Sequence, residues 1–263
     1  MKSINGKKVL ITGASNGIGA AVALELAKRG AIPIMVARSK DKLQTLQNRL
    51  KEDFQIEATY YPVDLLNLSE WKQVIERIKI ENVAIDAIIN NAGIGLFESL
   101  DKIEWKEVEK MLRLNNKALI YTTHAFLHRL KQRPEAHIIN IASQAGKIAT
   151  PKSAVYSATK SGVISFSNAL RLELIDTNIR VMTVNIGPVK TNFFDHADPS
   201  GSYQNNVAKY MLEADYVAKK IVQAMFTKKR EINLPYWMQV GAIVYQLFPA
   251  TMEKVLHKQF HSK

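Results

Sequence analysis

A tyrosine and a lysine lie four positions apart in the sequence, at Tyr156 and Lys160, and Ser143 precedes the tyrosine by thirteen positions. Residues four apart on a helix share one face, so the phenol and the ammonium can be neighbours. A free tyrosine has a pKa of about 10, too high for efficient proton exchange at neutral pH, and a nearby positive charge lowers it. The pair therefore indicates an acid–base site with Tyr156 as the proton-transferring residue.

A second pair with the same spacing, Tyr216 and Lys220, shows that chance alone can produce this pattern. Only Tyr156 has a serine thirteen positions upstream, and Ser143 directly follows an apolar run typical of a buried strand. The equivalent position for the second pair is Tyr203. We therefore assign the chemistry to the first pair and predict that the second lies on a solvated helix face.

A glycine-rich turn follows the first apolar run of the chain, at residues 12–19. Its glycines follow the spacing G-x-x-x-G-x-G, and glycine lets a backbone turn tightly and come close to a pyrophosphate. The helix that begins in this turn adds free N–H groups and the positive end of its dipole. The pattern predicts a dinucleotide site with contacts from Gly13, Ser15, Asn16, Gly17, Ile18 and Gly19.

The end of the second apolar run indicates which dinucleotide binds. An acidic residue there would bond the adenosine ribose hydroxyls and repel a 2′-phosphate. This chain instead has Arg38 followed by Ser39. A guanidinium binds phosphate in a bidentate geometry, and the serine adds a donor. We therefore expect NADP(H) as the cofactor, with an ordinary surface arginine as the alternative. The charge of an oxidised nicotinamide would further lower the pKa of Tyr156.

The elements that position these residues alternate between apolar runs and helical patterns, which is typical of βαβ units with a parallel sheet. The runs are apolar almost throughout, as in strands covered on both faces. We predict a doubly wound α/β fold in a single domain over residues 1–263. Strands are expected at 8–12, 32–37, 58–63, 84–90, 137–142, 180–186 and 232–235, and helices at 17–29, 40–52, 69–80, 104–130, 153–175 and 211–226.

Together these features resemble the compact, single-domain branch of the short-chain dehydrogenase/reductase family. The resemblance rests on TGASNGIG at 12–19, NNAG at 90–93, Asn115, Ser143 and Tyr156-x-x-x-Lys160, and it extends from about residue 7 to residue 191. It implies a Rossmann-type fold, hydride transfer between a nicotinamide and a carbonyl or secondary alcohol, and a homodimer or homotetramer. Residues 192–263 correspond to the variable substrate-binding region and a C-terminal extension.

The resemblance also implies a role for each catalytic residue. Ser143 would hydrogen-bond the substrate oxygen, and Lys160 would hold the nicotinamide ribose. Asn115 resembles the residue that helps a water connect Lys160 to bulk solvent. Asn116 is adjacent and could be confused with it. Asn115 is favoured because it precedes Ser143 by 28 residues.

Further cofactor contacts are carried over by the same resemblance. Asp64 would accept a bond from the adenine amino group, and Asn90 and Ala92 would fall beside the adenosine ribose, with Asn91 bracing the sheet. Residues 186–191 would flank the nicotinamide carboxamide, although the order here is Gly-Pro where the family has Pro-Gly. The contacts assigned in this way are Asp64, Asn90, Ala92, Gly93, Gly187, Val189 and Thr191.

The segment after residue 191 carries the substrate preference in this interpretation. Residues 192–206 are polar, typical of a mobile loop over a cleft, and residues 236–248 are strongly apolar. The apolar segment could be core, a subunit contact, the wall of an apolar substrate pocket or a membrane-facing surface, and core or a subunit contact ranks first. Within residues 251–260, an apolar helical face with lysines beside it suits an interfacial helix. That face would consist of Met252, Val255, Leu256 and Phe260.

Composition excludes other classes of protein. The chain has no cysteine, which rules out thiol catalysis and thiolate metal sites, and we expect no metal. The net charge of +12 is spread along the chain, which favours a solvated basic surface over a dedicated polyanion site, and the clustered basic residues with base-stacking aromatics that nucleic-acid binding needs are not found. No signal-peptide run and no stretch of about 18 apolar residues occurs. We therefore expect a cytoplasmic protein, with peripheral membrane contact as a further possibility.

Two other functions are compatible with parts of the pattern. A dinucleotide-sensing regulator that lost its chemistry should lack Tyr156, Lys160 or Ser143, and all three are present. An enoyl reductase is the second alternative, but family members with that chemistry often space the tyrosine and lysine differently. The favoured substrate is therefore a small carbonyl or alcohol compound, expected to be apolar.

Overall fold

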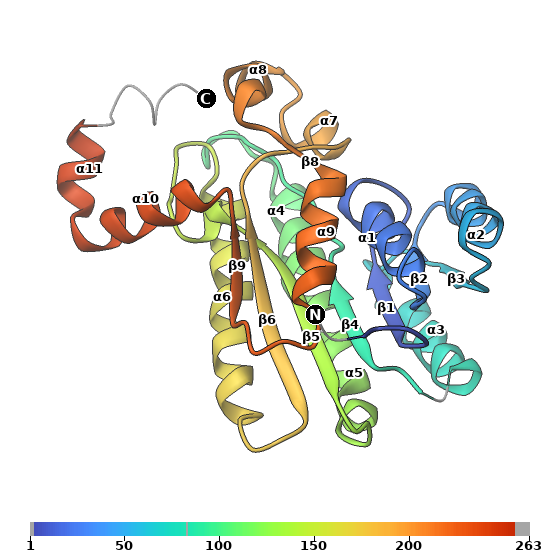
Figure 1. The fold of residues 1–263 in the computed structure, drawn as a ribbon. Helices are drawn as coiled ribbons and strands as arrows, with labels where there is room; N and C mark the ends of the chain where they lie inside the picture. Colours follow the sequence, from blue (N-terminus) through green and yellow to red (C-terminus); the bar gives the residue numbers. More distant parts are fainter. Residues whose placement is uncertain (1–2, 83, 256–263) are drawn as a thin grey trace.

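The computed structural model describes residues 3–82 and 84–255 and contains a seven-stranded parallel sheet in the order β3-β2-β1-β4-β5-β6-β9 (Figure 1). The strands are β1 Lys8–Thr12, β2 Ile32–Ala37, β3 Thr59–Pro62, β4 Ala87–Asn90, β5 Ala136–Ser143, β6 Ile179–Ile186 and β9 Glu231–Leu234. β4 begins later than expected. The carboxylate of Asp86 accepts the backbone N–H of Lys8 at 3.0 Å, so pairing with β1 starts at Ala87.

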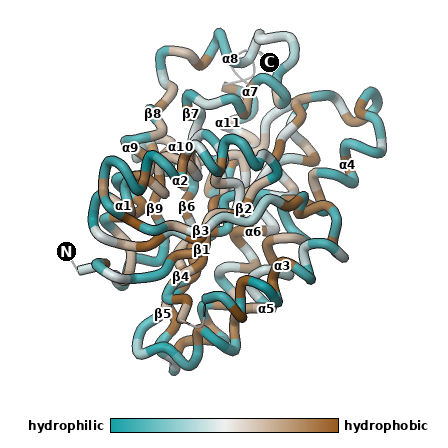
Figure 2. Tube along the Cα trace, turned by 90° about the vertical axis from the view of Figure 1, so that its right-hand side faces the viewer, coloured by the Kyte–Doolittle hydropathy of each residue, from teal (hydrophilic) through white to brown (hydrophobic). Residues whose placement is uncertain are grey.

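Helices cover both faces of the sheet (Figure 1). One layer comprises α1 Gly17–Ala27, α2 Lys40–Phe54 and α9 Ala214–Ala224, and the other comprises α3 Leu68–Glu81, α4 Trp105–Leu112, α5 Leu119–Lys131 and α6 Ala154–Glu173. Each layer closes its own apolar core, with Leu43 and Ile221 in the first and Trp71 and Phe126 in the second. Figure 2 shows the resulting contrast between the hydrophobic strands and the largely hydrophilic helix α2. The doubly wound α/β fold is thereby confirmed.

The strand order reverses between β1 and β4, because β2 and β3 lie to one side of β1 and the later strands lie to the other. In open α/β sheets, ligands bind outside the carboxyl ends of the strands at such a point. The glycine-rich turn follows β1, and residues 91–95 follow β4, so both lie there. The side-chain amide of Asn91 ties them together by donating to the carbonyls of Thr12 at 3.0 Å and Gly13 at 3.1 Å.

The single helix expected over residues 104–130 is interrupted by a π-helical segment, Arg113–Ala118, between α4 and α5. A π segment widens the helix by one residue per turn, and such segments are frequent at functional sites. Here it carries Asn115, whose side chain bonds both backbone groups of Ile94 in the segment after β4. The periodicity of the sequence did not reveal this interruption, because the amide partner lies on another element.

The chain after β6 departs most from expectation. The segment expected as a loop at 192–206 contains two short helices, α7 Phe193–Ala197 and α8 Ser202–Val207. The helix expected from residue 211 begins at Ala214, because Leu212–Glu213 form β8, which pairs with β7 Val189–Lys190. Residues 3–82 and 84–255 include no helix long and apolar enough to cross a membrane.

Two final helices, α10 Tyr236–Leu247 and α11 Pro249–Val255, project from the body of the protein beside β9 (Figure 1). Only Ala242 of α10 is buried, whereas Leu247 and Phe248 are 66% and 61% exposed. A core role for residues 236–248 is therefore wrong, because α10 packs chiefly on β9, on the short helix after β5 and on α11. Of the expected amphipathic face, Leu256 and Phe260 lie outside the described residues.

Candidate active site

A cleft of about 970 Å³ opens at the carboxyl ends of the strands. It is lined by the turns after β1 to β6, by α6 and by parts of α7, α8 and α10. Most residues assigned from the sequence line it: Gly13, Ser15, Asn16, Gly17, Ile18, Arg38, Asp64, Ala92, Gly93, Ser143, Tyr156, Lys160, Gly187, Val189 and Thr191. Four assigned residues do not line it: Gly19, Ser39, Asn90 and Asn115.

Tyr156 and Lys160 lie one turn apart on α6 and both reach the cleft. The Nζ of Lys160 donates to the carbonyl oxygen of Ile141 at 3.0 Å and lies 5.8 Å from the centroid of the Tyr156 ring. The second Tyr–Lys pair lies on α9, away from the cleft lining, and Tyr216 is 44% exposed. Helical spacing alone therefore did not distinguish the two pairs, whereas the position of each helix does.

Burial shifts the pKa of both residues. It lowers the pKa of Lys160 to about 8, because the charged amine loses water. It raises the pKa of Tyr156, while a hydrogen bond with Ser143 acts in the opposite direction. Among the protein groups, desolvation outweighs the hydrogen bond with Ser143, so the fall expected for the pKa of Tyr156 beside an oxidised nicotinamide stays a prediction. Tyr156 is a protonated acid at neutral pH, able to donate a proton to an oxygen in the cleft.

Ser143 ends β5, next to the carboxyl end of β6. Its Oγ donates to the carbonyl oxygen of Ile186 at 3.2 Å and accepts the backbone N–H of Ala145 at 3.1 Å. Both bonds fix the hydroxyl at the strand end, where it also interacts with the Tyr156 side chain. The serine and the tyrosine can therefore contact one substrate oxygen.

Asn115 lies behind this pair and is almost completely buried. Its Nδ2 donates to the carbonyl of Ile94 at 2.9 Å and to Oγ1 of Thr159 at 3.0 Å. A Cβ added at Gly93 would lie 3.2 Å from Oδ1 of Asn115 and 3.4 Å from Nζ of Lys160, so both polar groups flank that glycine. The adjacent Asn116 reaches only α6, through a 2.9 Å bond to the Thr159 carbonyl.

The turn after β1 fits a pyrophosphate. Gly13 and Gly17 have positive φ angles of 68° and 53°, which glycine adopts without strain. A Cβ at Gly13 would lie 2.9 Å from Cα of Ala92, and one at Gly17 would lie 3.1 Å from Cγ2 of Thr191. The turn therefore leaves the N-terminus of α1 uncovered by side chains. Gly19 serves packing instead, because a Cβ there would lie 2.3 Å from the Gly13 carbonyl oxygen.

The next two strands supply the side chains that fit an adenosine phosphate. Arg38 follows β2 and is exposed at the cleft, and it makes no ion pair with any described residue. Asp64 follows β3 and accepts the backbone N–H of Leu66 at 3.0 Å. Ser39 precedes the first residue of α2 and lies outside the cleft lining. The arginine is thus the cationic group at this end of the cleft.

Asn90 points away from the cleft, in contrast to its assignment beside the ribose. Its Nδ2 donates to Oγ1 of Thr123 at 3.0 Å and to Oδ1 of Asn140 at 2.8 Å, both buried between the sheet and α5. The side chain therefore holds β4, β5 and α5 together. Ala92 and Gly93, two and three residues later, do line the cleft.

Sequence analysis missed a group of aromatic residues at the substrate end of the cleft, here called the aromatic cluster. Its members are Phe97, Phe193, Phe194 and Tyr203, and all four line the cleft around Tyr156. They come from the segment after β4 and from α7 and α8. The adjacent phenylalanines in the otherwise polar segment 192–206 were the available signal.

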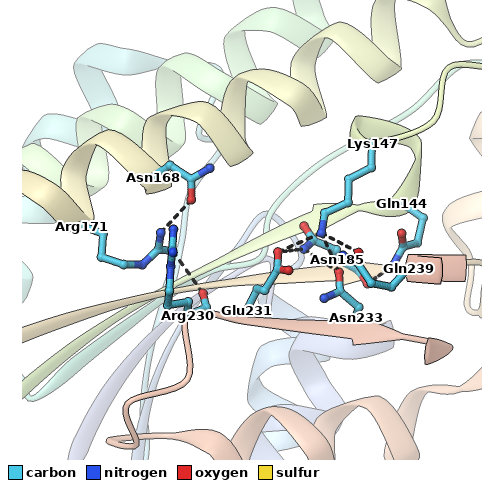
Figure 3. A network of polar contacts seen from close by, with 9 residues as sticks. All are labelled: Gln144, Lys147, Asn168, Arg171, Asn185, Arg230, Glu231, Asn233 and Gln239. Atoms are coloured by element: carbon cyan, nitrogen blue, oxygen red, sulfur yellow. Dashed lines mark hydrogen bonds and ion pairs between the residues drawn. The ribbon is translucent and has the colours of Figure 1, made fainter. Parts of the chain in front are cut away.

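A polar network beside the cleft was also missed (Figure 3). Nζ of Lys147 donates to Glu231 at 2.9 Å, to Asn233 at 2.9 Å and to Gln239 at 2.7 Å. These bonds join the loop after β5 to β9 and to α10. Burial acts to raise the pKa of the Glu231 carboxyl group. The bonds with Lys147 and with the neighbouring side-chain amides have the larger combined effect, so the pKa lies below its usual range.

The fold and the cleft are those of a nucleotide-binding α/β protein with a tyrosine and a lysine side by side at the strand ends. Comparison with known proteins identifies its family. The model for short chain dehydrogenases matches residues 7–200, so the chain belongs to this family of oxidoreductases. A Staphylococcus haemolyticus protein described as an uncharacterized oxidoreductase is 30% identical and covers 89% of this chain and 96% of its own length.

Solved structures agree with this assignment. A short-chain dehydrogenase from Sphingobium yanoikuyae in complex with NADPH is 26% identical, with a TM-score of 0.79 over 93% of this chain and 95% of that chain. A short chain dehydrogenase/reductase from Burkholderia phymatum in complex with NAD is 19% identical, with a TM-score of 0.86 over 95% of this chain and 96% of that chain. At that identity the second likeness concerns the fold alone.

Proposed function

We propose that the protein is an NADP(H)-dependent oxidoreductase that interconverts a carbonyl compound and its secondary alcohol. The observation that carries the proposal is the convergence of Ser143, Tyr156 and Lys160 on one cleft, beside a turn that fits a pyrophosphate. A nicotinamide dinucleotide, when bound, supplies or accepts the hydride. The chain's own residues handle the proton and the substrate oxygen.

In the reductive direction, Oη of Tyr156 gives its proton to the carbonyl oxygen while hydride adds to the carbonyl carbon, which leaves an alcohol and a tyrosinate. Oγ of Ser143 hydrogen-bonds the same oxygen, and the ammonium of Lys160 stabilises the tyrosinate. A water held near Asn115 then returns a proton from solvent. Oxidation of the alcohol runs through the same groups in reverse.

The choice of NADP(H) rests on Arg38, whose guanidinium lies at the cleft after β2. The NADPH complex of the Sphingobium yanoikuyae relative supports it. The presence of all three residues of the acid–base group favours an enzyme over a regulator without chemistry. We also propose a cytoplasmic homodimer or homotetramer, in which the exposed apolar residues of α10 make a subunit or membrane contact.

Initial rates of NADPH oxidation with a panel of ketones and aldehydes test this function, with Tyr156→Phe as the matched variant. Removing a positioned acid lowers kcat by about 10²- to 10⁴-fold, while the dissociation constant for NADPH should stay nearly unchanged. If the variant keeps more than about a tenth of the wild-type kcat with a substrate whose chemistry limits turnover, Tyr156 does not transfer the proton.

A further inference from the structure

The aromatic cluster packs against the ring of Tyr156. The ring centroid of Phe97 lies 5.8 Å from that of Tyr156, at an interplanar angle of 77°, and 5.1 Å from that of Tyr203, at 75°. Phe193 lies 5.8 Å from Tyr156 on a second side. These separations fall within the range of about 4.5–7 Å in which edge-to-face ring pairs are favourable. The cluster therefore presents both ring edges and ring faces beside the reacting phenol.

A glycine allows the rings to come this close to the phenol. A Cβ at Gly95 would lie 2.7 Å from Cζ of Phe193 and 3.2 Å from Cδ2 of Tyr156. The carbon that reacts must place its oxygen at the Tyr156 hydroxyl. One of the two groups bonded to that carbon can then lie toward Phe97 and Phe193, which line the same cleft.

The last two helices add apolar and polarizable side chains to the cleft lining. Trp237 and Met238 of α10 and Met252 of α11 line the same cleft. Met238 lies over the segment after β6, because a Cβ at Gly187 would lie 2.7 Å from its Sδ. Thioether sulfur makes favourable contacts with aromatic rings. A substrate ring in the cleft could therefore contact thioether sulfur as well as aromatic rings.

Apart from Lys160, which donates to the Ile141 carbonyl, the charged groups at this end of the cleft are paired with one another. Lys110 donates to Oε1 of Glu107 at 2.6 Å, and Nε2 of His196 lies 3.8 Å from the other oxygen of that carboxylate. Among the described residues, Arg38 is the only arginine of the cleft lining, and it follows β2 at the far end. A substrate carboxylate here would lose water without a bidentate partner, which is unfavourable.

We propose that the substrate carries an aromatic ring on its reacting carbon, so that it is an aryl ketone or aldehyde, or the corresponding benzylic alcohol. This inference rests on the proposed function, because Tyr156 must contact the substrate oxygen. Phe97 and Phe193 are then the residues that select the ring, and Tyr156 remains the acid. Carboxylate-bearing hydroxy acids of similar size bind poorly.

Three secondary alcohols with the same methyl carbinol test the proposal: 1-phenylethanol, 1-cyclohexylethanol and 3-hydroxybutyrate. Their dissociation constants are measured by calorimetry on the full-length protein saturated with NADPH, where no turnover occurs. Ring–ring contacts should make the phenyl compound bind about 2- to 12-fold more tightly than the cyclohexyl compound. 3-Hydroxybutyrate should bind at least about tenfold more weakly than 1-phenylethanol, because its carboxylate finds no partner.

Two variants assign the preference to the cluster. Phe97→Leu and, independently, Phe193→Leu keep an apolar side chain but remove a ring, so each should bring the phenyl-to-cyclohexyl ratio toward one. Tyr216→Leu, on the exposed part of α9, is the matched control and should leave the ratio unchanged. The proposal is overturned if 3-hydroxybutyrate binds as tightly as 1-phenylethanol, or if the phenyl preference is absent or survives both leucine variants.

Turnover of the ketones that correspond to these three alcohols distinguishes failure of the aryl preference from failure of the proposed function. Reduction of acetoacetate in preference to acetophenone leaves an oxidoreductase and removes only the aryl preference. Failure to bind NADPH or NADH, or absence of nucleotide oxidation with every ketone although the alcohols bind, removes the oxidoreductase function itself.

Discussion

The ammonium of Lys147 lies 2.7 Å from the side-chain oxygen of Gln239, and this bond joins the loop after β5 to α10 (Figure 3). The residue before the lysine packs on the catalytic helix, since a Cβ at Gly146 would lie 2.7 Å from the backbone carbon of Lys160. Two residues before Gln239, Trp237 lines the substrate end of the cleft. The network therefore couples the position of α10 to the site.

Gln239→Leu should raise KM for a ketone substrate more than it changes kcat, because α10 loses its bond to the loop while Tyr156 is untouched. The ion pair of Lys147 with Glu231 remains in this variant, so the free energy of unfolding should change little. Lys147→Met removes both the bond to Gln239 and the ion pair with Glu231. It should therefore also lower the free energy of unfolding by about 1–2 kcal/mol. Initial rates and urea unfolding measure the two effects.

Lys51→Met is the control for this pair of variants, since Lys51 forms an exposed ion pair with Glu57 on the far side of the molecule. It should leave both KM and stability within error of the wild type. If Gln239→Leu lowers kcat by the same factor as it raises KM, the network instead holds the residues of the acid–base pair in position.

Arg38→Asp should reverse the preference between the two nicotinamide dinucleotides. The charge-assisted bond to a 2′-phosphate contributes about 1.5–3 kcal/mol, or roughly 10- to 150-fold in the dissociation constant for NADPH. Fluorescence titration with NADPH and NADH measures it. Lys42→Asp makes the same charge change on the exposed side of α2 and should have a much smaller effect. Equal affinity of the wild type for both dinucleotides would contradict the role of Arg38.

His137 should make the protein sensitive to acid. The side chain is fully buried on β5, its Nδ1 accepts the backbone N–H of Phe226 at 2.9 Å, and burial lowers its pKa to about 3. Because the unfolded state binds a proton below about pH 6.5 and the folded state does not, stability is lost as the pH falls from 6.5 toward 3. The loss from this residue amounts to at most about 5 kcal/mol.

Urea unfolding between pH 7.5 and pH 4 (about one pH unit per step) compares the wild type with His137→Asn, which keeps an acceptor for the Phe226 N–H. The stability of the wild type should fall relative to the variant by up to about 1.4 kcal/mol per pH unit below pH 6.5. A difference between the two proteins that does not vary with pH would mean that His137 has the same pKa in the folded and unfolded states.

If the exposed apolar face of α10 contacts a membrane, the full-length protein should bind anionic liposomes at low salt. Ile243, Leu247 and Phe248 are 47%, 66% and 61% exposed, and no residue of α10 is charged. Leu247→Glu should abolish co-sedimentation because it places a charge at the interface, whereas Leu172→Glu, on exposed α6 surface, should not. If the full-length protein stays in the supernatant, this face serves a subunit contact, which light scattering of Leu247→Glu would reveal as a smaller assembly.

The sequence by itself determined the features that depend on local chain geometry. The doubly wound α/β fold follows from alternating apolar runs and helices, because such alternation is typical of βαβ units with a parallel sheet. The turn at 12–19 needs glycine at positions of positive φ, which is a local backbone requirement. Tyr156 and Lys160 share a helical face for the same kind of reason. These features could therefore be recognised without knowledge of what packs against them.

Only the tertiary structure decided which way several side chains face and what they meet. Asn90 turns into the interior because Asn140 and Thr123 offer it buried partners on other elements. Phe97 meets Phe193 across 96 positions of sequence, and Lys147 meets Gln239 across 92. Desolvation of Tyr156 likewise depends on all of its neighbours together. Such contacts are set by the packing of whole elements, which no local pattern of residues encodes.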